Sequence, residues 1–161
     1  MKLKIFTSIT VFIIVVFTFV SLSFKTKENQ FQTKILNIWE NNKFVKVIDL
    51  LEKPYDIMCI IPPYGFKVID NSGSKEVLKI NKYLNKNNYQ TDEYNWALVI
   101  LNNNNIELFE FDRGEIEIVL PYKEKDIPKG VTAKNCIKLE NGYFYLFTEK
   151  DRKHIILGDK K

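Results

Sequence analysis

Residues 55–65 read YDIMCIIPPYG, and this stretch decides the fold. The run Ile57–Ile61 is apolar throughout, which is typical of a strand that is buried on both faces. Pro62 and Pro63 have no N–H group to donate to a neighbouring strand, so the strand must stop before them. We therefore expect a central strand over Asp56–Ile61 that ends in a rigid turn.

The same stretch carries Cys59, one of two cysteines in the chain; the other is Cys136. An even number of cysteines in an exported chain predicts a disulfide. A bond that closes the loop from Cys59 to Cys136 would stabilise the fold by about 4–5 kcal/mol in the chain-entropy description. The alternative is two separate buried thiols, since free cysteine is common in protein cores.

Export is predicted by the first residues of the chain. Lys2 and Lys4 precede Ile5–Phe24, a run of 20 residues that carries no charge. This length is sufficient to cross a bilayer, and it also suits a long signal peptide. We expect residues 1–24 to anchor the chain in the membrane, with the C-terminal part outside the cytoplasm. The alternatives are cleavage near residue 23, which would give a secreted or periplasmic protein, and a buried helix of a soluble core.

The composition of the remaining chain argues against nucleic-acid binding. Lys2 and Lys4 are two of the 24 basic residues, which leaves 22 against 20 acidic residues. Only Arg113 and Arg152 are arginines, whereas phosphate and base recognition favours arginine in basic patches. We therefore predict no nucleic-acid partner.

The chain after the leader divides into two parts. We expect a helical juxtamembrane stalk over residues 25–40 and a single domain over residues 41–161.

Two helices are expected in this domain. The first follows Asn41-Asn42, carries apolar residues at helical spacing from Phe44 to Leu51, and ends before Pro54. The second begins after Ser74, whose hydroxyl can cap it, and covers residues 75–86.

Strands are expected in the rest of the domain. Trp96–Leu101 and Ile106–Phe111 form a hairpin around four asparagines, and residues 115–120 alternate. Residues 136–139, 143–148 and 154–157 form a final meander, with Asn141-Gly142 as a hairpin signal. The predicted fold class is α+β, with both helices packed on one face of an antiparallel sheet of five or six strands.

The segment from Val47 to Gly65 resembles part of a family of uncharacterised small exported bacterial proteins. These proteins have Trp-Asp, an apolar strand and Pro-Tyr; here Tyr55-Asp56 stands at the first position and Pro63-Tyr64 at the last. The strand, asparagine-rich turn and strand from Trp96 to Arg113 are a second similarity. The resemblance implies an exported compartment and a similar fold, and it implies no particular activity.

Catalytic, cofactor and metal sites are not predicted. His154 is the only histidine, and a Cys–His pair would need a free thiol from Cys59 or Cys136. Zinc and calcium spacings are absent from the sequence. Glu115 and Glu117 share one face of a strand, but glutamates of this kind usually form a solvated surface.

The sequence therefore favours a non-enzymatic protein-binding module with an immunity, inhibitor or envelope-accessory role. Its expected partners are the membrane, through residues 5–24, and an envelope protein. The candidate binding surface contains Tyr64, Tyr143 and Tyr145, because aromatic residues are enriched among interface anchors. The alternative is that they fill a β core or cover its solvent face. The alternative function is a hydrolase-like enzyme that uses carboxylates such as Asp56 and Glu115, or His154.

Overall fold

The structure, a computed structural model, describes residues 30–51, 54–70, 73–138 and 140–160. The expected leader lies outside these residues, so the anchor over residues 5–24 stays a prediction. In the part of the chain that is described, no helix combines the length and the apolar character that a membrane crossing needs.

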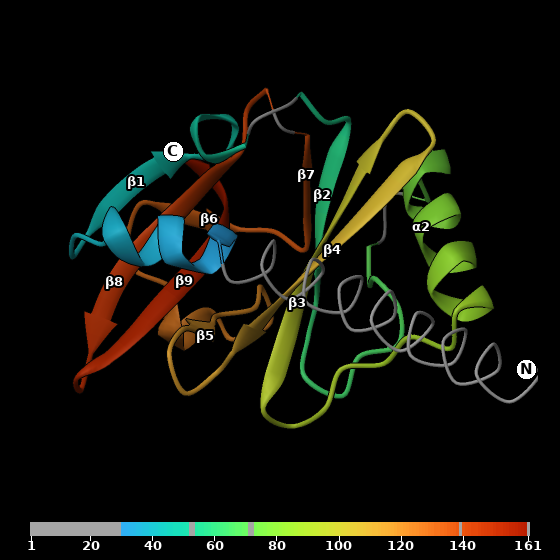
Figure 1. The fold of residues 1–161 in the computed structure, drawn as a ribbon. Coiled ribbons are helices and arrows are strands. Elements are labelled where there is room, and N and C mark those ends of the chain that lie inside the picture. Colours follow the sequence, from blue (N-terminus) through green and yellow to red (C-terminus); the bar gives the residue numbers. More distant parts are fainter. Residues whose placement is uncertain (1–29, 52–53, 71–72, 139, 161) are drawn as a thin grey trace, which may run out of the picture.

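The chain forms two sheets and an α-helix that flanks one of them (Figure 1). The five-stranded sheet has the order β1-β8-β9-β5, with β6 also paired to β9, and the four-stranded sheet has the order β4-β3-β2-β7. All pairs are antiparallel except β5 with β9. The strands are β1 Lys43–Lys46, β2 Ile57–Ile61, β3 Asn95–Asn102, β4 Asn105–Asp112, β5 Glu117–Ile118, β6 Val131–Ala133, β7 Cys136–Lys138, β8 Tyr143–Glu149 and β9 Arg152–Lys160.

Within the described residues, helical structure is found at four places. Residues 30–37 are helical, α2 spans Lys75–Lys86, and two 3-10 helices cover Val47–Leu50 (η1) and Glu124–Asp126 (η2). The prediction for α2 is confirmed at both ends, and the Ser74 hydroxyl caps it by accepting a hydrogen bond from the Val77 N–H at 3.2 Å.

The main core lies between the two sheets. Alternate residues of β2 and β3 face alternate residues of β8 and β9 across this space, and Phe31 and Ile35 of the helical segment 30–37 pack against the same cluster. The other face of β2 and β3 packs against α2, which contributes Val77, Ile80 and Leu84. The four-stranded sheet is therefore covered on both faces, which explains why all five residues of β2 are buried.

The α+β class is confirmed, but the prediction of one sheet with two helices on one face is wrong. The strands form two sheets, and β7 pairs with β2 in one of them while β8 pairs with β1 and β9 in the other. The Asn141-Gly142 turn therefore connects the two sheets and does not close a hairpin. Of the two described α-helical segments, α2 packs on the outer face of the four-stranded sheet, whereas the helical segment 30–37 packs toward the core between the sheets.

The helix predicted between residues 41 and 53 is also wrong. Lys43–Lys46 form β1, which pairs with β8, and η1 follows. Ile48, which the helical pattern placed in the core, is 40% exposed, whereas Val45 and Val47 are buried. Beta-branched residues disfavour the helical conformation. The segment pairs with β8, about a hundred residues later in the chain, and this pairing makes it a strand.

Candidate functional site

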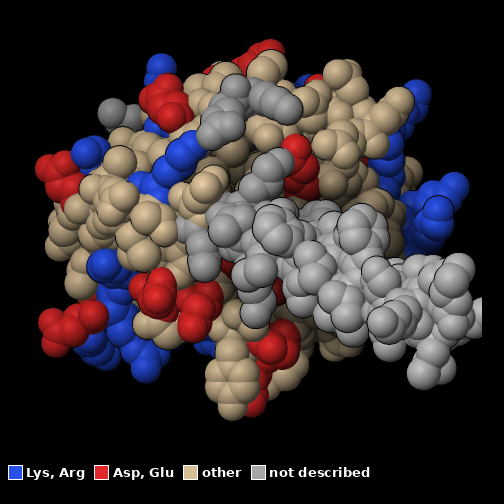
Figure 2. All heavy atoms as spheres, viewed as in Figure 1, with Lys and Arg blue, Asp and Glu red and all other residues tan. Residues whose placement is uncertain are grey.

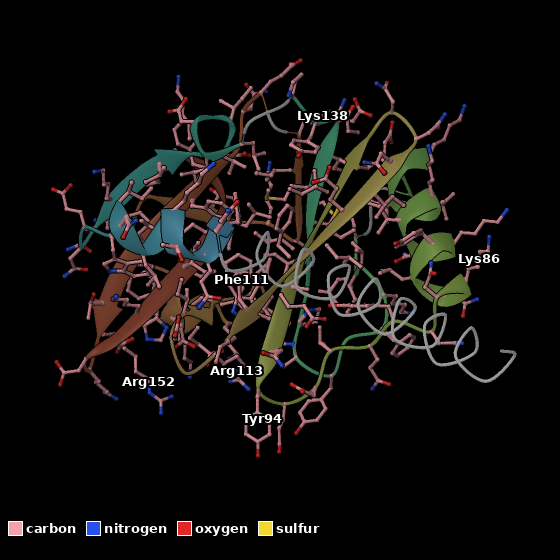
Figure 3. The ribbon with its side chains drawn as sticks, in the orientation of Figure 1. Lys86, Tyr94, Phe111, Arg113, Lys138 and Arg152 are labelled. Atoms are coloured by element: carbon pink, nitrogen blue, oxygen red, sulfur yellow. A yellow bond between two sulfur atoms is a disulfide. The ribbon has the colours of Figure 1, made fainter. Side chains whose placement is uncertain are left out.

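Exposed aromatic side chains gather where β2 ends and β3 begins. Tyr64 is 61% exposed, Phe66 59% and Tyr94 66%. The two strands are antiparallel neighbours, so the turn after β2 and the segment that leads into β3 lie at the same end of the sheet. Tyr94 projects from this lower edge of the molecule, close to Arg113 (Figure 3). We call Tyr64, Phe66, Glu93 and Tyr94 together the aromatic end surface.

The turn that carries Tyr64 has an unusual backbone. The Gly65 N–H donates to the Pro62 carbonyl at 2.8 Å, which closes a four-residue turn with Tyr64 at its third position. Tyr64 has φ +58°, the sign that a type II turn requires there and that glycine or asparagine normally supplies. A bulky side chain in this region is strained, and such residues persist only where the surroundings fix them.

Thr91 is the residue that fixes the turn. It is the one buried polar residue in the described ranges, at 3% exposure. Its hydroxyl donates to the Pro62 carbonyl at 2.6 Å and accepts from the Gly65 N–H at 2.9 Å, while its own N–H donates to the Gly65 carbonyl at 3.0 Å. A Cβ on Gly65 would lie 2.6 Å from the Pro62 oxygen, so only glycine allows this close approach.

Replacing Thr91 by valine should loosen the turn with little change in volume. The Thr91→Val variant keeps the shape of the side chain but removes the hydroxyl that bonds the partly buried Pro62 carbonyl and Gly65 N–H, which leaves these two groups with their bond to each other. We expect a loss of about 1–3 kcal/mol in the free energy of unfolding. Urea denaturation checks this value. Thr91→Ser, which keeps the hydroxyl, is the matched control and should retain most of the stability; equal losses in both variants would show that the hydroxyl is not the stabilising group.

Glu93 joins the two exposed tyrosines. The Tyr64 hydroxyl donates to Glu93 Oε2 at 2.8 Å. Hydrogen bonding from Tyr94 and then from Tyr64 lowers the pKa of the Glu93 carboxyl, and hydrogen bonding to Glu93 raises the pKa of both tyrosines. The surface therefore holds an ionised carboxylate at neutral pH, flanked by two neutral phenols.

Arg113, the residue that follows β4, supports this arrangement. Its Nη1 donates to the Glu93 backbone carbonyl at 2.8 Å, and its Nε and Nη2 bind the Glu117 carboxylate at 3.0 and 2.9 Å. Asp92 accepts from the Tyr94 N–H at 2.8 Å. The guanidinium therefore already donates hydrogen bonds to the Glu117 carboxylate and to the Glu93 backbone carbonyl. The segment that carries Glu93 and Tyr94 is tied to its surroundings on both sides.

A hollow of about 380 Å³ opens beside Phe66. Its wall combines the start of the segment after the turn, the last turns of α2 and the connection that follows α2. Phe66, Leu84 and Tyr89 supply its apolar lining, and Asn85, Asn88 and Gln90 supply polar groups. An apolar recess with a polar rim next to exposed aromatic residues is a common form of protein-binding surface.

The three tyrosines expected in one binding surface lie in two places. Tyr64 belongs to the aromatic end surface, whereas Tyr143 and Tyr145 lie on β8 of the other sheet. Tyr145 is buried, at 8% exposure, and its hydroxyl donates to Asn42 Oδ1 at 2.9 Å. Tyr143 packs edge-on against the Phe44 ring. Tyr145 therefore packs inside the molecule, whereas Tyr143 is partly exposed beside Phe44.

Sequence reasoning missed Phe66, Glu93 and Tyr94. Tyr94 follows a polar stretch, and its only sequence signal was an aromatic residue among charged neighbours. The contacts that link Glu93 to Tyr64 and Thr91 to Gly65 join residues 26 to 29 positions apart, so no local pattern could reveal them.

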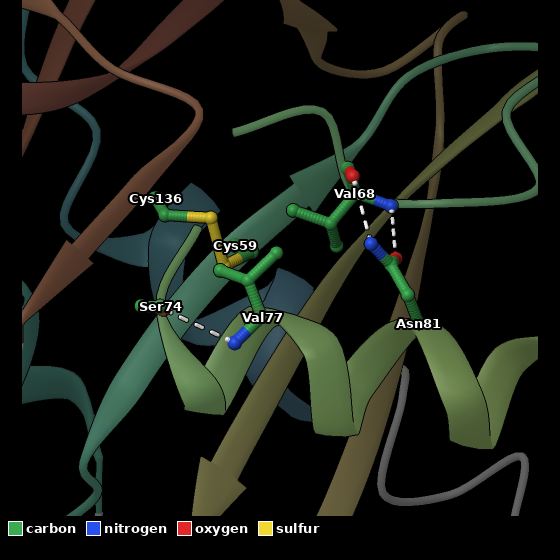
Figure 4. Close-up of a disulfide and its surroundings, with 6 residues drawn as sticks. All are labelled: Cys59, Val68, Ser74, Val77, Asn81 and Cys136. Carbon is green, nitrogen blue, oxygen red and sulfur yellow. Dashed lines mark hydrogen bonds between the residues drawn. A yellow bond between two sulfur atoms is a disulfide. The ribbon is translucent and has the colours of Figure 1, made fainter. Parts of the chain in front are cut away.

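The predicted disulfide is present between Cys59 and Cys136, which face each other across β2 and β7 with Cα atoms 4.1 Å apart. Cys59 is fully buried beneath α2 (Figure 4). Asn81 of α2 also binds both backbone polar groups of Val68, at 2.7 and 3.1 Å. Cys136 is partly exposed at the wall of a hollow of about 780 Å³.

The residues named for an alternative enzymatic function are not brought together. Asp56 accepts from the Asn103 N–H at 2.5 Å, and Glu115 accepts a hydrogen bond from Gln32. His154 stacks on Phe147, and its Nδ1 is a buried atom without a hydrogen-bond partner among the described residues. His154 lines a hollow of about 340 Å³ that contains neither Asp56 nor Glu115.

In the ranges that the structure describes, no group of three or more His, Cys, Asp or Glu side chains is arranged to hold a metal ion.

No family model matches the chain, and no curated protein and no solved structure matches it either.

Proposed function

We propose that this chain is an exported, membrane-anchored, non-enzymatic module that binds another protein through the aromatic end surface. The observation that carries the proposal is the exposure of Tyr64, Phe66 and Tyr94 at one end of a sheet that is otherwise well covered. Large aromatic side chains are the commonest energetic anchors of protein interfaces. Three such side chains left exposed to water do not give the isolated domain the stabilisation that their full burial would give.

The backbone at Tyr64 supports the same proposal. A strained φ of +58° destabilises the turn, and the protein compensates with the Thr91 contacts. Strain of this kind gathers at ligand clamps and other functional positions. A side chain held in one direction before binding loses less conformational entropy on binding.

The proposed location rests on the sequence and on the disulfide. The uncharged run from residue 5 to residue 24 is long enough to span a bilayer. The bond between Cys59 and Cys136 fits an oxidising compartment. An immunity, inhibitor or envelope-accessory role is consistent with both features.

A capture experiment from solubilised envelope extract tests the proposal. The bait is the full chain in detergent, as wild type, as a Tyr64→Asn/Tyr94→Ser double variant, and as Tyr122→Ser. Asparagine tolerates positive φ, so the double variant removes two aromatic rings without adding strain. Tyr122 is 69% exposed and follows β5, so it is a matched control.

We expect wild type and Tyr122→Ser to capture the same protein, and the double variant to bind the purified protein about 30-fold more weakly. The captured protein is identified by mass spectrometry, and the affinities are then measured with purified components. Equal binding by all three baits would place the interface elsewhere and contradict the proposal.

A further inference from the structure

The aromatic end surface contains a carboxylate that has no cationic partner in the described part of the chain. The ion pairs found there are Lys43–Glu40, Arg113–Glu117 and Lys134–Asp159. Arg113 contacts Glu93, but its guanidinium binds the Glu117 carboxylate through two nitrogens and bonds only the backbone carbonyl of Glu93. Glu93 therefore presents its charge outward.

The partners of this carboxylate leave room for a cation. The Tyr64 hydroxyl donates to Oε2 at 2.8 Å. An ionised carboxylate offers about four lone-pair positions, so the two phenols leave some of them open. The rings of exposed tyrosines also attract ammonium and guanidinium groups through their π faces.

The surrounding charge favours a positive ligand. Asp92 and Asp112 lie at the same end of the sheet, and both already accept backbone hydrogen bonds, from Tyr94 and from Gly114. The nearby cations are Arg113, which is paired, and Lys67, whose Nζ lies 5.6 Å from the centre of the Phe66 ring. Figure 2 shows Asp and Glu side chains gathered along this lower edge. The negative potential of these acidic side chains raises the rate of encounter with basic segments of other proteins and lowers it with acidic segments.

We propose that the aromatic end surface receives a lysine or arginine side chain from a basic segment of the partner protein, with Glu93 as the counter-ion between Tyr64 and Tyr94. This inference rests on the proposed function and specifies the chemistry of the partner. The guanidinium or ammonium group would contact the carboxylate, and the aliphatic stem would lie against the aromatic rings.

Peptide titrations observed by NMR test the inference. The full chain, with [13C]tyrosine and in detergent micelles, is titrated with acetylated and amidated peptides that carry three lysines, three arginines or three glutamates separated by glycine. We expect saturable shifts of the Tyr64 and Tyr94 ring signals with both basic peptides and none with the acidic peptide. Glu93→Gln should weaken basic-peptide binding about fivefold. Glu149→Gln, a change of an exposed acid on β8, should leave it unchanged.

The pH dependence gives a second readout. Because its tyrosine partners lower the pKa of Glu93 from 4.5, the carboxylate stays ionised as the pH falls from 7 to 5. Binding of the basic peptides should therefore hold through that range and decline only below pH 4.5, as the carboxylate takes up a proton. The Glu93→Gln variant should lack that contribution. Asp92, Tyr64, Tyr94 and Arg113 are the titratable and charged groups around Glu93. Hydrogen bonding to Glu93 raises the pKa of both tyrosines above 10.0, so both stay neutral in this range.

The outcomes separate the two proposals. Loss of partner capture in the double tyrosine variant, together with unchanged capture in Glu93→Gln and no shifts with basic peptides, would keep the protein-binding proposal and overturn the cation inference. Equal shifts with acidic and basic peptides would also overturn it. Basic-peptide shifts confined to Tyr64 and Tyr94 and weakened by Glu93→Gln would support it.

Discussion

Removing the bond between Cys59 and Cys136 should lower the free energy of unfolding by about 2–5 kcal/mol. The bond closes a loop of sequence separation 77 that contains α2 and the strands from β3 to β6. It also fixes β7, a three-residue strand that sits in the four-stranded sheet while its chain neighbours β6 and β8 belong to the other sheet. Without the bond, this segment would be held only by its backbone pairing with β2 and by the packing of Ile137 in the main core.

Urea denaturation of wild type and of the Cys59→Ala/Cys136→Ala double variant measures this contribution. Wild type in the presence of a thiol reductant is the control, because it loses the bond without any change of side-chain volume. We expect reduced wild type and the double variant to unfold at similar, lower urea concentrations. A midpoint unchanged by reduction would show that the bond between β2 and β7 does not stabilise the fold.

The second large effect is expected at Trp96. Its side chain is fully buried between the two sheets, its ring stacks on Phe111 with centroids 4.2 Å apart, and its Nε1–H donates to the Ile116 carbonyl at 2.8 Å. Trp96→Ala would leave a large cavity and a buried carbonyl without its donor, so we expect a loss of about 3–5 kcal/mol in the free energy of unfolding.

A more conservative variant separates the two causes. Trp96→Phe keeps most of the aromatic volume and loses the N–H group, so it should cost less than Trp96→Ala. Chemical denaturation followed by circular dichroism gives both values, and Trp39→Phe is the control for loss of a tryptophan at a partly buried position. A loss below about 1 kcal/mol in Trp96→Ala would contradict a shared core between the sheets.

The elements that sequence reasoning located correctly are those with strong local signals. Alpha-2 has a serine cap, an amphipathic pattern and a polar stretch after it, all within residues 74–88. The hairpin of β3 and β4 has two apolar runs around an asparagine turn, and Asn103 takes the positive φ that such turns favour. In both cases the information that decides the structure lies inside the element.

The wrong predictions concern segments whose secondary structure depends on residues far away in the sequence. The spacing of Phe44, Val47, Ile48 and Leu51 fits a helix, yet Val45 pairs with Phe144 and places the segment in a sheet. The residues of β7 pair with Met58 and Cys59, about 77 positions earlier, so the meander expected at the end of the chain does not form. Strand pairing across such separations leaves no periodic signal in the sequence.

The candidate site shows the same division. The Pro-Pro-Tyr-Gly sequence marked Tyr64 as a turn residue at a strand end, and the structure places it on the surface with positive φ. Tyr145 has an equally aromatic neighbourhood, but the register of β8 turns its side chain inward toward Phe147 and Val119. Which aromatic residues remain exposed depends on sheet register, which the sequence alone did not specify.

Amide hydrogen exchange of the full chain, measured with and without its captured, purified partner, is the most direct test that the aromatic end surface is the binding surface. We predict that binding slows exchange in residues 62–67 and 90–94, and that Thr91→Val, which loosens the turn, reduces this protection. Protection confined to β8 and β9 or to residues 121–133, with no change at the turn after β2, would contradict the account.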